Sequence, residues 1–404
     1  MSMAIDVEHV ISPEEFRARQ ERVRAAAAER GFDGVVVWSR GGGPVDMSAD
    51  VAYLANHYSQ QPYMTDHVGI GSGRSHGVLV VPVEGPTIVI VDVPWWRRDL
   101  VVADDVRTGN DVVALAVDAT RSAGLDTRRV GLVGASNMSA SAYLAFVAGL
   151  PDMDLHRADT LVEELRIHKS PAEVTLLRAA IALGTEAVRS SFELVQPGNT
   201  EADVAAEVAA VVARGGGALY DAPCSSGANS HHFTWGRMPS WDARRAMLPG
   251  DIFHMDTYGA LGGYFWDFGR CRVVGDQPSA DQIELIEANI AIVDAVCAAI
   301  RPGIRACDAH RAGADVAAHL PIVRRLADNP SDTEGFPALG HGIGMGWEGP
   351  WITETDETIL EPGMGIAVET LFGEPGLGGT FFEENGIVTE DGFEVLSAVQ
   401  KRWW

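Results

Sequence analysis

The sequence predicts an α/β N-terminal domain followed by an α+β C-terminal domain, and three observations support this division. Segments with helical and strand-like patterns alternate up to about residue 155. Beyond that point, a helix, a Pro-Gly pair and a second helix occur twice, about a hundred residues apart. Strand-like segments lie between and after these helix pairs. We therefore expect one domain at residues 1–158 and a second at residues 159–404.

The N-terminal domain is expected to begin with a helix. Ser12-Pro-Glu-Glu15 has the pattern of a capping box with proline at the first helical position, and the helix should run to about Gly31. The segments that follow predict an alternation of strands with one further helix. We expect strands at 34–38, 77–83, 87–93 and 129–133, and a helix at 112–123.

The C-terminal domain is expected to contain two pairs of helices. Ser170-Pro-Ala-Glu173 is a second capping box, and the helix that it opens should end at Pro197-Gly198, with another helix from Thr200. The same order recurs as a helix at 279–300, Pro302-Gly303, and a helix to about His319. This repetition predicts a domain built from two similar halves.

Four segments of the C-terminal domain are expected as strands. They lie at 251–257, 264–274, 364–370 and 381–389. Only the turn-rich stretch from Tyr258 to Gly263 separates the first two, so we expect these two strands to pair antiparallel.

Composition and charge exclude several classes of protein. Of 404 residues, 46% are hydrophobic and 22% charged, which predicts a globular core. The 31 basic residues against 56 acidic ones leave a net charge of −25, so nucleic acid is not an expected partner. No apolar run approaches the roughly 18 to 20 residues that a membrane helix needs, and the first residues lack a signal-peptide pattern, so we expect a cytoplasmic protein without a membrane partner.

The four cysteines do not suggest a zinc ribbon or a disulfide framework. All four lie in the second half of the chain, without any C-x-x-C pair. We interpret them as reduced structural thiols.

Four carboxylates and one histidine occupy positions that the pattern predicts to be buried. Asp256 and Asp267 lie eleven residues apart on the two strands expected to pair. His341 lies in a glycine-lined stretch, Glu369 ends one apolar strand and Glu383 opens another. Burying a carboxylate costs several kcal/mol unless its charge is compensated.

The sequence offers few cations for that compensation. It contains only two lysines, and no run of arginines lies near these positions. Four carboxylates and one imidazole suit two divalent cations that share bridging oxygens, and Mn²⁺, Zn²⁺, Co²⁺ and Fe²⁺ all fit such ligands. The sequence therefore predicts a site for two divalent metal ions.

These motifs resemble those of the pita-bread metallopeptidase superfamily, which includes methionine aminopeptidase, X-prolyl aminopeptidase, prolidase and creatinase. The resemblance covers essentially the whole chain, and it implies a creatinase-like N-terminal domain and a pita-bread catalytic domain. It rests on the aspartate pair in 254–267, the histidine motif 340–344, the glutamate motif 361–369 and the final motif 383–392.

The resemblance also implies roles for the five residues. Asp256 would hold one metal, His341 and Glu369 the other, and Asp267 and Glu383 would bridge both. Creatinase itself works without metals, so this chain resembles the metal-dependent branch. The two metals would lower the pKa of a bridging water, so that hydroxide attacks a carbonyl-type carbon, and Glu369 would also shuttle the proton.

Further residues are expected to contact substrate. The segment 226–233 resembles a family segment whose histidine lines the substrate pocket and acts as acid or base in creatinase. His232 is the expected catalytic residue, and His231 is the alternative because the loop length is ambiguous by one. Trp347 and Glu348, beside the histidine motif, are also expected to bind substrate. Trp235 and Trp266 are either pocket or core residues.

Arg74 is a candidate substrate clamp from the N-terminal domain. Gly73-Arg74 resembles the creatinase segment whose arginine reaches into the neighbouring subunit and binds the substrate carboxylate, so this role would require a homodimer. Residues 73–77 also fit the G-x-S-x-G pattern of serine hydrolases. That pattern needs a helix after the serine, whereas we expect a strand there.

The chain departs from X-prolyl peptidases at two positions. Their second, substrate-contacting histidine is missing, because that stretch reads Met345-Gly-Trp-Glu348. The arginine that they place two residues before the last glutamate is Phe381 here. Both losses argue against ordinary prolyl-peptide cleavage.

These observations predict a metal-dependent hydrolase that cleaves a C–N bond, in an amide, amidine or peptide-like molecule, of a small carboxylate-bearing substrate. The first alternative is an X-prolyl dipeptidase or aminopeptidase. The second is a dimethylsulfoniopropionate lyase-like enzyme that uses the same metal site. A non-catalytic binding module is a further alternative, against which the intact set of five ligands argues.

Overall fold

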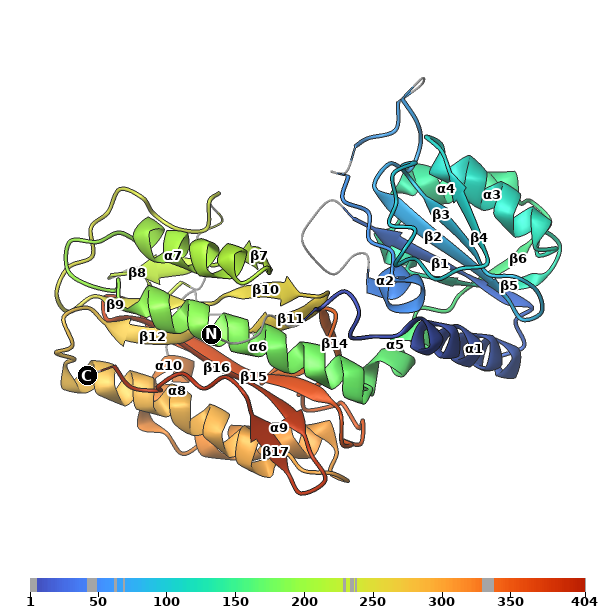
Figure 1. The fold of residues 1–404 in the computed structure, drawn as a ribbon. Coiled ribbons are helices and arrows are strands. Elements are labelled where there is room, and N and C mark those ends of the chain that lie inside the picture. Colours follow the sequence, from blue (N-terminus) through green and yellow to red (C-terminus); the bar gives the residue numbers. More distant parts are fainter. Residues whose placement is uncertain are drawn as a thin grey trace. The chain divides into compact units, whose positions relative to one another are not determined.

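The structure is a computed structural model that describes residues 6–41, 49–61, 64–67, 70–227, 230–232, 236, 238–328 and 338–403. The chain forms two compact units, Met1–Arg166 and Ile167–Trp404 (Figure 1). Each unit is described by itself below.

The first unit is built on a six-stranded mixed sheet in the order β4-β3-β2-β1-β5-β6. Strand β1 pairs antiparallel with β2 and parallel with β5, and the expected strands and helices of this unit are confirmed. The strands are β1 Gly34–Arg40, β2 His76–Pro82, β3 Ile88–Val91, β4 Asp105–Thr108, β5 Arg129–Val133 and β6 Asp154–Arg157. The helices are α1 Pro13–Glu29, α2 Ala49–Ala55, α3 Val112–Ser122, α4 Ala140–Gly149 and α5 Thr160–Ile167, with a 3₁₀ turn at Ala135–Asn137.

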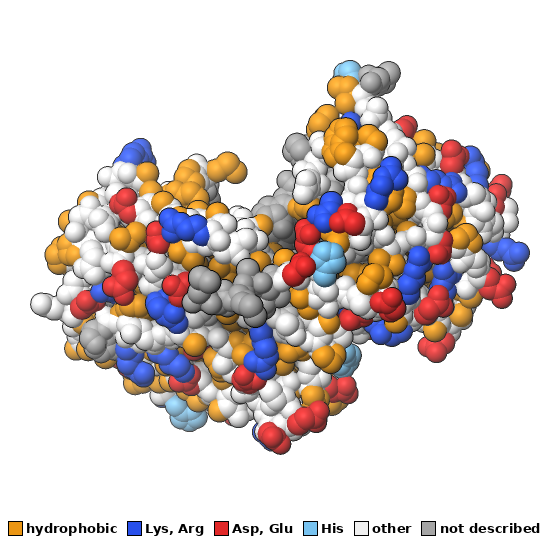
Figure 2. All heavy atoms as spheres, viewed as in Figure 1, with side chains coloured by type: hydrophobic (Ala, Val, Ile, Leu, Met, Phe, Trp, Pro, Cys, Tyr) orange, Lys and Arg blue, Asp and Glu red, His pale blue; other side chains and the backbone are white. Residues whose placement is uncertain are grey.

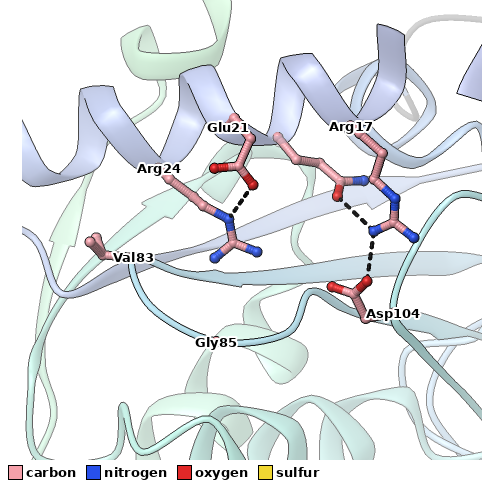
Figure 3. A pocket seen from close by; sticks show the side chains of 7 residues that line it. Arg17, Glu21, Arg24, Val83, Gly85 and Asp104 are labelled. Atoms are coloured by element: carbon pink, nitrogen blue, oxygen red, sulfur yellow. Dashed lines mark hydrogen bonds and ion pairs between the residues drawn. The ribbon is translucent and has the colours of Figure 1, made fainter. Parts of the chain in front are cut away.

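Helix α1 begins where its cap predicts. Ser12 accepts a hydrogen bond from the backbone N–H of Glu15, which satisfies one of the free donors of the first turn. Figure 3 shows α1 above an open pocket of the first unit, where Arg17 donates to Asp104 at 2.8 Å and Arg24 donates to Glu21 at 3.1 Å. Each guanidinium therefore faces a carboxylate.

The second unit contains the two expected helix pairs. Complete capping boxes at Ser170, Thr200 and Ser279 begin three of the helices. Helix α6 packs against β10 and β11, and α8 packs against β15 and β16 (Figure 1). The helices of this unit are α6 Pro171–Phe192, α7 Glu201–Arg214, α8 Ala280–Ala299, α9 Ala306–Ala317 and α10 Pro321–Asp328.

The strands of the second unit form three sheets, in the orders β11-β10-β7, β12-β9-β8 and β14-β13-β15-β16-β17. The first two sheets use β7 Ala218–Asp221, β8 Cys224–Ser226, β9 Ile252–Met255, β10 Tyr258–Leu261, β11 Tyr264–Asp267 and β12 Arg270–Val273. The third uses β13 His341–Ile343, β14 Trp347–Trp351, β15 Gly365–Glu374, β16 Gly378–Val388 and β17 Phe393–Val395.

The segment from 251 to 274 differs from its expected form. Strand β9 does pair antiparallel with β12, but the stretch expected to be a simple turn contains strand β10, which pairs with β11. The chain turns only at Gly262 and Gly263, whose φ values of 60° and 84° suit glycine. Asp256 and Asp267 therefore lie where one long hairpin passes from one sheet to the next.

The core of the second unit joins its helices to its sheets. Buried apolar residues from β9, β12, β15, β16, α8 and α9 form one cluster. Trp266 is fully buried and packs where α6 lacks a side chain, at Gly184, so it is a core residue. Among the described residues, no helix has both the length and the apolar composition to cross a membrane. Figure 2 shows acidic and basic side chains interspersed over the visible face.

Candidate metal centre

Five ionisable side chains of the second unit lie within strands or directly beside the ends of strands. All five are at most 9% exposed. Glu369 in β15 lies directly opposite Glu383 in β16, so the two side chains share one face of the sheet. The other three are Asp256, which follows β9, Asp267, which ends β11, and His341, which begins β13.

His341 lies between two of these carboxylates. Its Nε2 atom is 3.5 Å from Oδ2 of Asp267 and 3.6 Å from Oε1 of Glu369. Asp267, His341 and Glu383 each offer one ligand atom, and these atoms lie within 4.8 Å of one another. Such spacing suits atoms that share a metal ion. The side chain of Asp256 interacts with that of Asp267, which brings the fourth carboxylate to the cluster.

The raised pKa values of three carboxylates show that ionising them inside this buried cluster is unfavourable. Burial, followed by the charges of the neighbouring carboxylates, raises the pKa of Asp256 and of Glu383 well above the usual range. Burial also raises the pKa of Glu369 to about 7, against an opposing effect of His341. For His341, burial lowers the pKa, but the hydrogen bond and charge of Asp267 and the charge of Glu369 outweigh it, so the net shift is upward.

The unpaired oxygens fit bound cations. Oδ1 of Asp256 and both carboxylate oxygens of Glu383 are buried without a hydrogen-bond partner in the described chain. Buried acceptors of this kind require a compensating group. Four carboxylates and an imidazole are ligands that divalent transition metals prefer.

The metal-free protein should become less stable as pH rises from about 4.5 to 7. The pKa of Glu369 is 4.5 in its reference state and about 7 in the folded chain, so the folded state binds its proton more tightly. Proton binding by Glu369 therefore stabilises the folded state by about 3 kcal/mol when the pH is below 4.5, and this stabilisation is lost as the pH rises through about 7. Urea unfolding midpoints across this range test the trend, and saturating metal should remove the slope. A metal-free protein whose stability rises with pH would contradict it.

Residues outside the expected set hold the carboxylates in place. The backbone N–H of Asp267 donates to Asn385 at 2.9 Å, and the Asn385 amide donates back to the Asp267 carbonyl. Arg270 is fully buried, donates to Glu384 at 2.9 Å and donates to the carbonyl of Glu383.

Arg270 compensates part of this buried charge, although the sequence has no run of arginines near these acids. Its positive charge lowers the pKa of Glu383, although burial and the neighbouring acids outweigh this effect. The sequence shows two charged residues, Arg270 and Arg272, in the strand that follows Asp267, but no local pattern shows which acid either one meets.

His231 and His232 lie on a loop that packs against the hairpin of β15 and β16. Their ring centroids are 4.0 Å apart. Ser230 accepts a hydrogen bond from the backbone N–H of Gly379 at 3.0 Å, and the absence of a side chain at Gly379 and Gly373 makes room for this loop. The hairpin that carries Glu369 and Glu383 thus also contacts the loop at Ser230 and His231. Trp235 lies outside the described residues.

Trp347 and Glu348 point to different partners. The Trp347 indole N–H donates to Oδ2 of Asp267, while the residue as a whole stays 39% exposed. The Glu348 side chain is 4% exposed and pairs with Lys169 at 2.5 Å. Glu348 is therefore engaged within the protein, and a contact with substrate remains a prediction.

Arg74 belongs to the first compact unit and lies in the turn before β2. It is partly buried, and its Nε atom has no hydrogen-bond partner in the described chain. A strand follows Ser75, as expected, and not the helix that the serine-hydrolase pattern needs. The role of Arg74 as a clamp for the substrate carboxylate remains a prediction.

Two family models match the chain. The model described as metallopeptidase family M24 matches residues 175–390, more than half of the chain. The model described as the creatinase/prolidase N-terminal domain matches residues 19–168.

Curated relatives match the chain over part of its length. The probable dipeptidase PepE of Mycobacterium tuberculosis is 32% identical over 58% of this chain and 60% of the relative, so the match leaves over a third of that relative uncovered. The Xaa-Pro dipeptidase of Pyrococcus furiosus is 27% identical over 61% of this chain and 68% of the relative.

Solved structures match the fold over almost the whole chain. Dipeptidase PepE from Mycobacterium ulcerans has a TM-score of 0.76 at 24% identity and covers 97% of this chain and 98% of that one. The prolidase from Pyrococcus horikoshii OT3 has a TM-score of 0.76 at 19% identity and covers 95% and 99%. These likenesses confirm the expected fold, an α/β N-terminal domain with a pita-bread C-terminal domain.

Proposed function

Because this chain belongs to metallopeptidase family M24, we propose that it is a metal-dependent hydrolase that cleaves the C–N bond of a small carboxylate-bearing substrate. The observation that carries this proposal is the buried cluster of four carboxylates around His341, in which oxygens of Asp256 and Glu383 find no hydrogen-bond partner within the described part of the chain. Such a cluster is costly for a protein that only binds a partner.

The proposed cofactor is a pair of divalent cations of the class Mn²⁺, Zn²⁺, Co²⁺ or Fe²⁺, with manganese the first to test. Asp256 would hold one cation, His341 and Glu369 the other, and Asp267 and Glu383 would contact both. When bound, the cations would supply Lewis acidity, lowering the pKa of a coordinated water and polarising a carbonyl.

Side chains of this chain would manage the proton and the substrate. Glu369 is the proposed proton acceptor and donor, because it lies at the centre beside His341. His232, or its neighbour His231, is proposed to line the pocket and to assist as acid or base. Trp347 and Glu348 are proposed substrate contacts, and Trp347 is the one that is exposed at the centre.

X-prolyl dipeptide cleavage is the second candidate, and one observation favours it. Relatives with similar sequences carry the names dipeptidase and Xaa-Pro dipeptidase. Against it, the buried pair of Glu348 with Lys169 occupies the stretch where those peptidases place a second substrate-contacting histidine.

An assay panel separates these functions. The purified chain is loaded with Mn²⁺, Zn²⁺ or Fe²⁺, its metal content is measured, and it is offered prolyl dipeptides, creatine and cyclic amidines of the ectoine type. We expect turnover of a non-peptide C–N substrate that disappears on chelation. Rapid hydrolysis of prolyl dipeptides would establish the second candidate, and a chain without bound metal or turnover would overturn both.

Arg74 is proposed to bind the substrate carboxylate from a partner subunit, within a homodimer. Arg74→Ala should raise KM for an anionic substrate about tenfold or more and change kcat less, because a clamp acts on binding. Steady-state kinetics test this, with Arg98→Ala as a control on the same unit, and sedimentation tests the dimer. Unchanged kinetics or a monomeric active enzyme would contradict the proposal.

Substituting His231 and His232 one at a time should show which of them acts as acid or base. If His232 acts as acid or base, His232→Ala should lower kcat about 100-fold or more, while His231→Ala should mainly change KM. Paired kinetic measurements with each variant decide between them, and the reverse result would assign the role to His231.

A cytoplasmic location is also proposed. The four cysteines are free, and Cys224, Cys271 and Cys307 are buried, as a reducing compartment permits. Fractionation of cells that express the chain tests this location.

A further inference from the structure

Three aromatic rings form a cluster beside the candidate metal centre. The ring centroids of Tyr258 are 5.2 Å from those of both Trp347 and Tyr220, and Tyr220 and Trp347 are 6.2 Å apart. Tyr220 is 42% exposed and Trp347 is 39% exposed. Large rings that share one contact network and still face water offer a surface on which a ligand group can rest.

A row of residues across one sheet places a carboxylate on each side of Tyr258. Asp267 in β11, Tyr258 in β10 and Asp221 in β7 are direct partners across the three strands. Directly opposed residues project from the same face of a sheet, so the phenol ring lies between two acidic groups. Asp267 belongs to the candidate metal centre, whereas Asp221 does not.

A β-bulge brings the third ring into this cluster. Strand β10 pairs Tyr258 with Asp221 and Gly259 with Leu219, so Tyr220 has no opposite residue. A bulge redirects the side chain of its extra residue. Here the redirected ring contacts those of Tyr258 and Trp347 instead of alternating to the other face of the sheet.

The surroundings of the cluster are electronegative. The Trp347 indole directs its N–H edge at Asp267, and the residue as a whole stays 39% exposed, so part of it faces solvent. Asp221 is not among the candidate metal ligands, so its negative charge stays available beside the Tyr258 ring when metal is bound. The Asp221 carboxylate accepts hydrogen bonds from Ser240 at 2.6 Å and from the backbone N–H of Ala222 at 2.8 Å, which fix its position.

We propose that Tyr220, Tyr258, Trp347 and Asp221 form a binding site for an organic ammonium group. Electron-rich ring faces and a nearby carboxylate attract an alkylated cation. An uncharged apolar group would use the rings but would gain nothing from the negative charge of Asp221, and an anion would be repelled. The assignment of this ligand as part of the substrate rests on the proposed hydrolase function, and it implies a substrate that carries a positive amino or quaternary ammonium group.

Calorimetric titration of the metal-loaded protein tests this site without turnover. The probes are choline and dimethylbutanol, its isostere in which an uncharged carbon replaces the ammonium nitrogen. We expect choline to bind at least about tenfold more tightly than the isostere. Tyr220→Leu and Asp221→Asn should each weaken choline binding by about fivefold or more and leave metal content unchanged.

Tyr143→Leu is the matched control, because Tyr143 is also 42% exposed but lies on α4 of the first unit, and this variant should bind choline like the parent. Equal affinity for the two probes, no measurable choline binding, or unchanged binding in Tyr220→Leu would overturn the proposal. Because binding is measured without catalysis, a chain that binds choline as expected but hydrolyses nothing in the assay panel would refute the hydrolase function alone. A chain that hydrolyses a substrate and ignores choline would refute the ammonium site alone.

Discussion

Replacing Glu383 by Gln is expected to abolish metal-dependent turnover, with a loss of at least about 1,000-fold, equivalent to about 4 kcal/mol of transition-state stabilisation. Both carboxylate oxygens of Glu383 are buried without a hydrogen-bond partner among the described residues, and one of them lies within 4.8 Å of ligand atoms from Asp267 and His341. The amide keeps the shape of the side chain but loses the negative charge that a shared cation requires. Metal content measured after dialysis should fall together with activity.

The same substitution should affect stability in opposite directions with and without metal. Without metal, Glu383 is a buried acid among like charges, so the neutral amide should leave the protein at least as stable as the parent. With metal, the parent gains stability from binding and the variant gains less. Thermal unfolding of both forms gives this comparison.

Glu374→Gln is the control on the same hairpin, because Glu374 is partly exposed and pairs with Arg325 at 3.0 Å. It should change neither metal content nor turnover. A Glu383→Gln protein that keeps its full metal content and activity would remove Glu383 from the metal centre.

Replacing Lys169 by Met is expected to destabilise the second unit by about 3–5 kcal/mol, because it removes the positive charge that pairs with the buried carboxylate of Glu348. The two side chains are 1% and 4% exposed and pair at 2.5 Å. Urea unfolding followed by far-UV circular dichroism measures the loss.

Two comparisons identify the ion pair as the cause. The double variant Lys169→Met/Glu348→Leu should recover most of the lost stability, because it removes both buried charges. Lys401→Met is the control: Lys401 is the only other lysine, its side chain is 37% exposed and it pairs with Asp294 at the surface. It also lies 3.9 Å from the buried Glu384, which keeps its pairing with Arg270 in the variant, so the expected cost is below about 1 kcal/mol. Equal losses in Lys169→Met and Lys401→Met would show that burial of this pair does not matter.

The elements that the sequence predicted well are those whose signals are local. The helix begun by Ser170 follows from its capping box and its apolar spacing, both of which lie within one stretch of chain. The stretch between Asp256 and Asp267 was harder, because four residues of β10 have the composition of a turn and become a strand only by pairing with β7 and β11.

The residue types of the candidate site could likewise be predicted, but their neighbours could not. Acidic residues at apolar strand positions predict buried carboxylates, and the negative charge of such carboxylates indicates a bound metal ion at the place where the strands meet. The pairing of Arg270 with Glu384 and of Lys169 with Glu348 joins residues 114 and 179 positions apart, and no local pattern indicates such partners.

The sequence by itself determined the two-domain order, the helix pairs and the choice of acids and histidine that predicts a metal centre, since capping, periodicity and the cost of buried charge act along short segments. The tertiary structure alone decided that Glu369 faces Glu383 across one hairpin, that Arg270 reaches the acids, and that a bulge turns Tyr220 toward Trp347. These features depend on the register between strands and on long-range packing, where energies of contact between distant residues select one arrangement among many that the same local pattern allows.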